Sequence, residues 1–253
     1  MNYPLWLLAL GLLFVAAERV WPRRPDQPIL RRGIWSDLVY IVFNSDYLGI
    51  LLSQASIYVI ALMHFERLPM GLLNHWPFPA QFALLLVAFD LFRWGIHNLL
   101  HRVPALWEFH KVHHSIVDMD WIGDWRFHWV EVIVYQSILY IPATLLGFRG
   151  DVMFWVGIVN TFVGHLAHAN LRFHLGPLKY IVNTPEMHIW HHNHPDSGPI
   201  NRNFGITLSI WDWLFGTAHV PSIDPARLGF TGIENYPTQL PGQWLAPFKA
   251  LLK

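Results

Sequence analysis

The pattern His-x-x-His-His occurs twice in this chain, as His110-Lys111-Val112-His113-His114 and as His188-Ile189-Trp190-His191-His192. Positions i, i+3 and i+4 of a helix share one face, so each box is predicted to be helical with its imidazoles pointing the same way. The chain has 16 histidines among 253 residues. Random placement of that many would give roughly 0.06 such boxes. The two boxes therefore indicate a metal site built on helices.

Composition narrows the class of protein. Hydrophobic residues make up 53% of the chain and charged residues 13%, where a soluble domain averages roughly 25% charged. This shortage of charge predicts that lipid surrounds part of the protein. The net charge is zero, so nothing favours a nucleic-acid partner. There is no cysteine, which excludes disulfides, iron–sulfur clusters and cysteine-bound zinc. A histidine- and carboxylate-based site suits iron, zinc or manganese.

Apolar runs alternate with the boxes. They cover residues 4–17, 38–63, 80–89, 130–147 and 152–164. No Lys or Arg precedes the first run and five arginines follow it up to Arg32, so an uncleaved anchor is expected rather than a signal peptide. If that arginine loop is cytoplasmic, the later runs bring every histidine box to the same side. We expect an integral, multi-pass membrane protein, such as one of a bacterial inner membrane.

The expected fold is all-α: a membrane helical bundle of about four or five embedded segments with a cytoplasmic, histidine-rich di-metal cap. We expect three parts: membrane anchor segments over residues 1–79, a catalytic region over 80–217, and a Pro- and Gly-spaced tail over 218–253 packed on that region.

The number of boxed histidines points to more than one metal ion. A bis-histidine haem needs two ligands, and a hydrolytic zinc site needs about three with one open position. The pair His97 and His101, just upstream of the first box, brings the boxed total to eight. This excess favours a dinuclear site. Two neighbouring irons with positions left for O₂ would oxidise an unactivated C–H bond.

The motifs between residues 82 and 217 resemble the sterol desaturase / fatty acid hydroxylase superfamily of integral-membrane, histidine-box di-iron oxygenases. The resemblance rests on the following segments: Asp90 to His97 with His101, Trp107 to Ser115, Arg126 to His128, His168 to Asn170, Thr184 to His192, Asn203 to Gly205, and Trp211 to Thr217. Two positions depart from the common family form. Asn98 replaces an Arg after the first histidine, and Trp129 replaces a Pro after the Arg-Phe-His element.

The resemblance implies two iron ions, with zinc as a possible substitute, and O₂ as co-substrate. It implies hydroxylation or desaturation of a lipid or sterol-like substrate drawn from the bilayer. No cytochrome b5 domain is recognisable, so a separate electron donor is expected, either cytochrome b5-like or a ferredoxin with its reductase. The implied metal ligands are His97, His101, His110, His113, His114, His168, His188, His191 and His192.

Other polar residues carry two readings each. His165 and His128 are additional ligands, or hydrogen-bonded histidines beside the site. Asn170 holds a metal-bound water in the functional reading. Asp90 is expected to pair with Arg93 or to orient an imidazole. Glu108 and Glu131 could each orient an imidazole through its free N–H, and Glu108 could instead be a solvated surface charge. Asp46 interrupts an apolar run, where an ionisable group is a functional candidate or marks a wetter helix end. The remaining histidines are predicted to be ordinary loop or interface residues: His64, His75, His174, His194 and His219.

Three functional alternatives stay open. A bis-histidine haem electron carrier would use two histidines only and show a Soret band. A zinc-dependent membrane hydrolase of lipids would use fewer ligands and no O₂. A non-catalytic metal-binding membrane protein, such as a transporter, would place ionisable residues along a pore, whereas here they cluster at one face.

Overall fold

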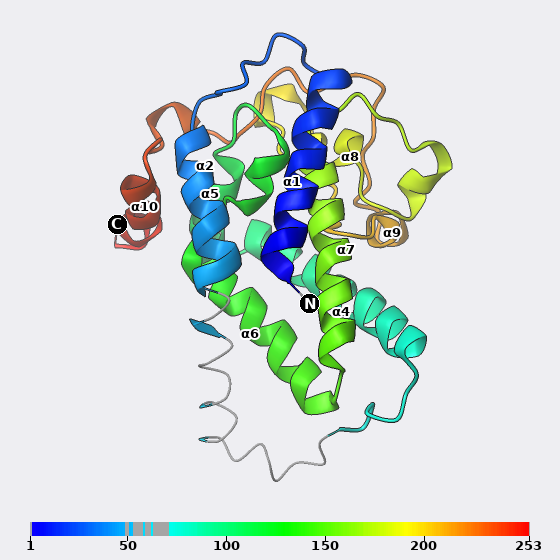
Figure 1. Cartoon of the computed structure of the whole chain (residues 1–253). Helices are drawn as coiled ribbons and strands as arrows, with labels where there is room; N and C mark the ends of the chain where they lie inside the picture. Colours follow the sequence, from blue (N-terminus) through cyan, green and yellow to red (C-terminus); the bar gives the residue numbers. More distant parts are fainter. Residues whose placement is uncertain (1, 49–50, 53–57, 59–61, 63–70, 253) are drawn as a thin grey trace.

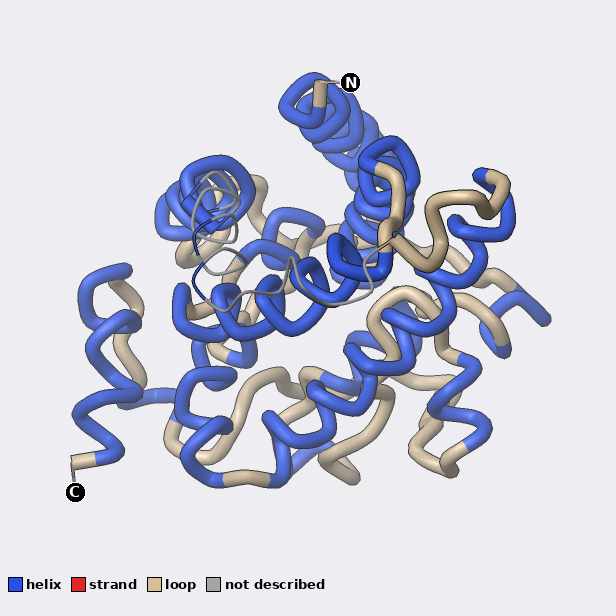
Figure 2. The backbone as a smooth tube through the Cα atoms, turned by 90° about the horizontal axis from the view of Figure 1, so that it is seen from below, coloured by secondary structure: helices blue, strands red, loops and turns tan. Residues whose placement is uncertain are grey.

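The computed structural model describes residues 2–48, 51–52, 58, 62 and 71–252, which form helices joined by loops (Figure 1). The α-helices are α1 (Tyr3–Val20), α2 (Ile34–Val42), α4 (Phe78–Arg102), α5 (Pro104–His114), α6 (Trp129–Leu146), α7 (Gly150–His168), α8 (Pro185–His191), α9 (Ile210–Leu214) and α10 (Leu240–Leu251). Shorter helical turns include η1 (Phe43–Tyr47), η3 (Trp121–Trp125) and η4 (Gly176–Tyr180). The tube view from below shows helix and loop and no strand among these residues (Figure 2). The all-α prediction is confirmed.

A proline corner joins the first two histidine-bearing helices. Helix α4 ends at Arg102, and Val103 adopts an extended conformation before Pro104 opens α5. A residue before proline is pushed out of the helical region, while proline itself suits the first turn of a helix. The dipeptide therefore stops one helix and starts the next without a long loop. As a result, His97 and His101 of α4 lie beside the box of α5.

Helices α6 and α7 form a hairpin around a glycine. Gly147 ends α6 with φ +85°, a conformation that favours glycine. A Cβ at this position would lie 2.5 Å from the Cα of Gly71, so the turn also needs glycine for a close backbone approach. Helix α7 then returns through the bundle, where it contacts α1, α4, α8 and η3. Its last residues, from Val163 to His168, are all buried.

Three helices among the described residues are long and apolar enough to cross a membrane, namely α1, α4 and α6. Helix α7, which holds the run expected over residues 152–164, is not one of them. The run expected over residues 38–63 lies largely outside the described residues; its first part forms α2 and η1. The Asp46 side chain and His64 also lie outside the description.

The two ends of the bundle hold different loops (Figure 1). At one end, the arginine loop after α1 contacts the histidine-box region: Arg23 N–H donates to the Asn170 carbonyl over 3.1 Å, and the Gln27 amide donates to the Met119 carbonyl over 3.0 Å. At the other end, Leu73 N–H donates to the Leu146 carbonyl over 2.9 Å. The arginine loop and the boxes thus share one end of the bundle.

The C-terminal tail packs back on the bundle through α10, which contacts α5. The Tyr40 hydroxyl on α2 donates to the Gln243 side chain on α10 over 3.1 Å. Phe248 packs edge-on against Phe109 of α5, with ring centroids 5.5 Å apart. The tail therefore covers the outer side of the first histidine-box helix.

Candidate metal centre

Nine histidines meet at the end of the bundle where α4, α5, α7 and α8 converge, and they form two groups. In each group, every side chain offers one nitrogen, and these nitrogens all lie within 4.8 Å of one another. The five-histidine group contains His97, His101, His110, His114 and His191. The four-histidine group contains His113, His168, His188 and His192. Eight of the nine are buried, and His101 is partly buried.

Each His-x-x-His-His box contributes to both groups. On α5, His110 and His114 belong to the five-histidine group and His113 to the four-histidine group. At α8 the division is reversed, with His188 and His192 in the four-histidine group and His191 in the other. The i, i+3, i+4 spacing therefore places a box between two neighbouring sites. The groups adjoin each other, since the stacked rings of His114 and His192 have centroids 4.4 Å apart.

The facing nitrogens are close together within each group. In the five-histidine group, the Nε2 atoms of His97 and His110 are 3.1 Å apart, as are those of His114 and His191. In the other group, Nε2 of His168 lies 3.3 Å from that of His113 and 3.0 Å from that of His188. Metal–imidazole bonds are about 2.0–2.1 Å long for zinc, so such separations suit two ligands of one ion.

The outer nitrogens of these rings are held by acceptors. Nδ1 of His97 donates to the Phe204 carbonyl over 2.8 Å, and Nδ1 of His191 donates to the Arg202 carbonyl over 2.8 Å. His110 donates to the Glu131 carboxylate over 2.8 Å. In the four-histidine group, His113 and His168 donate to the carbonyls of Arg126 and Gly164 over 3.3 and 2.9 Å. Such partners fix both the tautomer and the orientation of a ligating ring.

These hydrogen bonds leave pairs of facing nitrogens without a proton. A neutral imidazole that donates from Nδ1 has only a lone pair on Nε2. His97 and His110 are both in that state, and their Nε2 atoms face each other at 3.1 Å. His113 and His168 repeat the arrangement at 3.3 Å. Two facing lone pairs repel, and a cation between them converts that repulsion into coordination. The residues therefore fit a metal ion in each group.

Electrostatics keep the rings neutral. Burial lowers the pKa of His110, His113, His114, His188 and His192 well below the usual value for histidine, and the neighbouring imidazoles lower each of these pKa values further. The same two causes lower the pKa of His191. Only the neutral form has a lone pair to bind a metal. The protein thus presents these nitrogens ready for coordination at neutral pH.

Comparison with known proteins identifies the family. A family model for fatty acid hydroxylases matches residues 82–217, which is over half of the chain and includes all nine histidines. The chain belongs to the fatty acid hydroxylase family. This confirms the resemblance drawn from the motifs.

Individual relatives of this fatty acid hydroxylase family member are lipid enzymes. An ornithine lipid hydroxylase, OlsE, from Rhizobium tropici is 29% identical over 89% of this chain and 68% of its own length. An alkylglycerol monooxygenase from Xenopus tropicalis is 28% identical over 62% of this chain and 34% of its own length. A very-long-chain aldehyde decarbonylase, CER1, from Arabidopsis thaliana is 28% identical over 50% of this chain and 21% of its own length. The chain thus spans about two thirds of the first relative, about a third of the second and about a fifth of the third. No solved structure matches it.

Two histidines with alternative interpretations lie outside both groups. Nδ1 of His165 donates to the Asp124 carboxylate over 3.0 Å, and its ring packs against Trp121. His128 uses both nitrogens elsewhere: Nε2 donates to the Trp244 carbonyl over 3.0 Å, and Nδ1 accepts the Val130 N–H over 3.2 Å at the start of α6. The structure thus gives His128 a position between α6 and the C-terminal tail.

The other candidate polar residues face neighbouring loops. Asn170 exchanges hydrogen bonds with the backbone of Arg24. Asp90 accepts the N–H groups of Thr207 and Leu208 and the indole N–H of Trp211, each over 2.9–3.0 Å. Glu108 pairs with Lys111 over 2.5 Å. None of these three contacts an imidazole of either group.

Some supporting groups were absent from the sequence-based candidates. Asp124 lies 3.5 Å from Nδ1 of His168 and holds His165 as well. The amide oxygen of Asn201, a residue with φ +58°, lies 3.3 Å from Nδ1 of His101. The carbonyls of Arg126, Gly164, Arg202 and Phe204 complete the set. A backbone carbonyl leaves no signal in a sequence. Asp124 lies between the two boxes in the sequence, but only the tertiary packing brings it next to His165 and His168.

Proposed function

We propose that this protein is an O₂-dependent di-iron oxidoreductase that hydroxylates or desaturates a C–H bond of a membrane lipid. One observation carries the proposal: two adjoining groups of neutral histidines, with proton-free nitrogens facing each other, sit at the end of membrane-length helices. A single zinc site would leave most of these nine nitrogens without a role.

The proposed ligands form two sets, which are the two histidine groups described above. The five-histidine group would hold one ion and the four-histidine group the other. Iron bound there would supply the O₂ chemistry that attacks an unactivated C–H bond. The protein's own contribution is to orient the rings through the Nδ1 hydrogen bonds and to keep the imidazoles neutral. Glu131 places a carboxylate against His110 and so increases the electron donation of that ring.

The names of the relatives support a lipid substrate. Ornithine lipid hydroxylase and alkylglycerol monooxygenase are both named for oxygen insertion into lipids. Three membrane-length helices support a site close to a bilayer, which would deliver such a substrate. We propose that the arginine loop and the histidine groups face the cytoplasm, where a separate electron donor can dock.

The direct test is turnover by the purified, iron-loaded protein in lipid vesicles with a chemical reductant. Lipid extracts of a deletion strain and its complemented parent first identify the substrate. We expect the product to form in air and to be absent without O₂. His113→Ala should abolish product, because it removes a ligand of the four-histidine group. His75→Ala, in an exposed loop at the other end, should keep the parent's rate. Equal product without O₂ would favour a hydrolase instead.

A further inference from the structure

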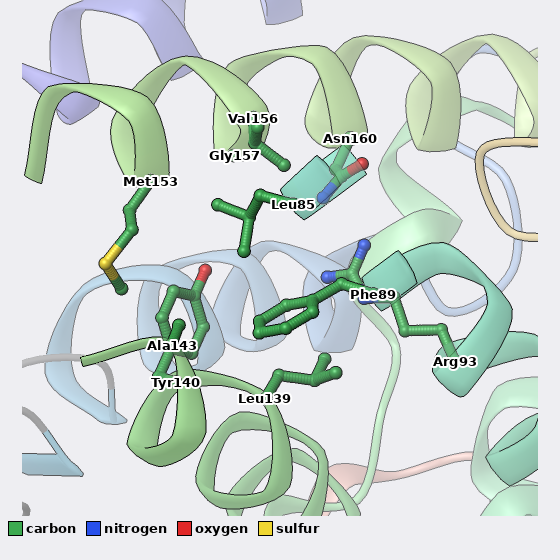
Figure 3. Close-up of a pocket in the computed structure, with 10 residues that line it drawn as sticks. All are labelled: Leu85, Phe89, Arg93, Leu139, Tyr140, Ala143, Met153, Val156, Gly157 and Asn160. Carbon is green, nitrogen blue, oxygen red and sulfur yellow. The ribbon is translucent and has the colours of Figure 1, made fainter. Parts of the chain in front are cut away.

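A cleft lies between the membrane-length helices α4 and α6 and helix α7 (Figure 3). Its lining is mostly apolar and includes Leu85 and Phe89 of α4, Leu139 of α6, and Met153 and Val156 of α7. The free volume is about 20 Å³, enough for a water molecule. The cleft borders Tyr140, whose side chain is 38% exposed on the outer surface. A longer guest would therefore lie along this outer opening and displace flexible side chains such as Met153.

One positive charge lines this apolar cleft. Arg93 of α4 points its guanidinium into the cleft, toward the side of Asn160 (Figure 3). Among the residues that the structure describes, no carboxylate lies within ion-pair distance of this guanidinium and none of these residues accepts a hydrogen bond from it. Its charge interacts with the Asp90 carboxylate electrostatically, without direct contact. Asp90, one turn earlier, is occupied by three N–H donors from the loop and α9. An unpaired charge within a membrane-length helix is costly and marks a functional site.

The helix faces that line the cleft lead to the metal centre. Leu85, Phe89, Arg93 and His97 follow one another at four-residue intervals along one face of α4. On α7, Asn160, Gly164 and His168 also follow one another at four-residue intervals. One helical turn separates Arg93 from His97, which is about 6 Å along the axis. A molecule held by Arg93 would therefore reach the histidines with the part nearest the charge.

We propose that Arg93 binds the anionic group of the lipid substrate, a carboxylate or a phosphate, while the acyl chain lies in the apolar cleft between α4, α6 and α7. Charge complementarity is the argument: a guanidinium that makes no ion pair or hydrogen bond with the described residues, and that lies in a cleft lined mostly by apolar side chains, is satisfied by an anion that carries a hydrocarbon chain. The proposal rests on the proposed function only in treating the bound lipid as the substrate. It makes Arg93 a specificity-determining residue.

Binding can be measured without turnover. The full chain is reconstituted in phosphatidylcholine vesicles, and three probes of equal chain length are compared: a fatty acid, a lysophosphatidic acid and a fatty alcohol. The native protein should bind one or both anions at least 10-fold more tightly than the alcohol. The comparison of the two anions distinguishes carboxylate from phosphate. Equal affinity for all three probes would overturn the proposal.

Variants separate the charge from the shape of the cleft. Arg93→Leu should weaken binding of the anion about 10- to 100-fold, the range expected for a lost hydrogen bond between charged groups, and leave the alcohol unchanged. Arg93→Lys should keep most of the preference. Asn160→Asp, nearly the same size, adds a negative charge beside the site and should weaken anion binding as well. Arg102→Leu removes an exposed charge from the same helix and should have no effect.

The binding measurement tests the role of Arg93 independently of the metal chemistry. If Arg93→Leu binds the anion as tightly as the native protein, while its melting temperature is unchanged, the inference fails even if lipid oxidation is demonstrated. If binding behaves as expected but no O₂-dependent product forms, the proposed function fails and the anionic-lipid site stands. For an active enzyme, Arg93→Leu should raise KM for the anionic substrate much more than it lowers kcat.

Discussion

At the residue scale, the hydrogen bond that Nδ1 of a histidine donates matters for metal binding as much as the Nε2 atom that faces the metal site. Nδ1 hydrogen bonds to Phe204, Arg202 and Glu131 make the Nε2 atoms lone-pair donors that face one another. A ligating histidine depends on such partners for its tautomer and its basicity. The carboxylate of Glu131 is the strongest of them in the five-histidine group, since the others are neutral carbonyls.

Replacement of Glu131 should therefore weaken metal binding. We expect Glu131→Leu to lower metal affinity about 10- to 100-fold, because His110 loses the carboxylate that accepts from its Nδ1. Glu131→Gln retains an oxygen acceptor and should lose less. Competition with a chelator followed by optical titration measures the change. Glu108→Gln is the control, as Glu108 contacts Lys111 and not an imidazole. Equal affinity in Glu131→Leu and the parent would show that the carboxylate does not tune the site.

His128 should matter for stability rather than for metal. Its ring begins α6 by accepting from Val130 and joins this helix to the Trp244 carbonyl of the tail. We expect His128→Ala to cost about 1–2 kcal/mol of folding free energy, as the loss of a helix N-cap does, while metal content stays at the parent's level. Thermal melting and metal analysis of the same sample distinguish this from a ligating role, which would lower the metal content.

The sequence predicted which histidines come together but not how they divide. The His-x-x-His-His spacing places three imidazoles on one helical face, and all nine expected residues lie in the two groups. The division of His113 from His110 and His114 depends on where α7 and α8 approach α5. That approach is a property of tertiary packing and leaves no trace in local spacing.

At the element scale, short helices are positioned by corners and close contacts. The Val103–Pro104 corner sets α5 against α4. Gly164 lets α7 approach η3, because a Cβ there would lie 2.6 Å from a carboxylate oxygen of Asp124. That carboxylate holds His165 and lies next to His168. The contact between α7 and η3 therefore supports the four-histidine group.

Gly164→Ala should disturb that group selectively. The added methyl group must displace Asp124, so we expect a loss of about half of the bound metal, with the five-histidine group retained. Metal analysis per folded chain measures this. Gly150→Ala at the other end of α7, where a Cβ meets nothing within 4 Å, should keep the full complement. A full complement in Gly164→Ala would mean that Asp124 does not support the four-histidine group.

At the scale of the whole molecule, the buried neutral histidines link stability to pH. Burial lowers the pKa of His110, His114 and His188 well below their usual value. In the metal-free protein, the stability that these groups contribute is complete above the unfolded pKa of about 6.5 and is lost as the pH falls toward the folded pKa values. We expect the melting temperature of the metal-free protein to fall as the pH is lowered below about 6.5. Bound metal competes with protons, so the metal-loaded protein should resist acid further. A melting temperature independent of pH over this window would contradict the account.

The chain lacks cysteine, which makes its orientation measurable. Residues 23–31 lie against the histidine-box region, and the loop before α4 lies against the α6–α7 turn. We expect a cysteine at Leu178, which is 53% exposed, to react with an impermeant thiol reagent only in opened cells. A cysteine at His75 should react in intact cells. The reverse pattern would place the histidine end outside the cell.

The global arrangement was predictable only in part. Hydropathy and arginine positions indicated that the boxes share one end, and the loop contacts agree with that arrangement. The role of α7 could not be read from its apolar run, since burial inside a bundle and exposure to lipid select similar residues. In the structure α7 packs against α1, α4 and α8 and ends in buried residues from Val163 to His168.

The number of metal ions bound per folded chain tests the central claim most directly. The protein is purified, loaded with iron under anaerobic conditions, freed of excess metal and analysed for iron and protein on the same sample. Two adjoining groups of histidine nitrogens predict about two ions per chain. They also predict that both ions are lost in a His110→Ala, His113→Ala double variant that still inserts in the membrane, because this variant removes one histidine from each group. One ion or none in the folded native protein would contradict the dinuclear centre.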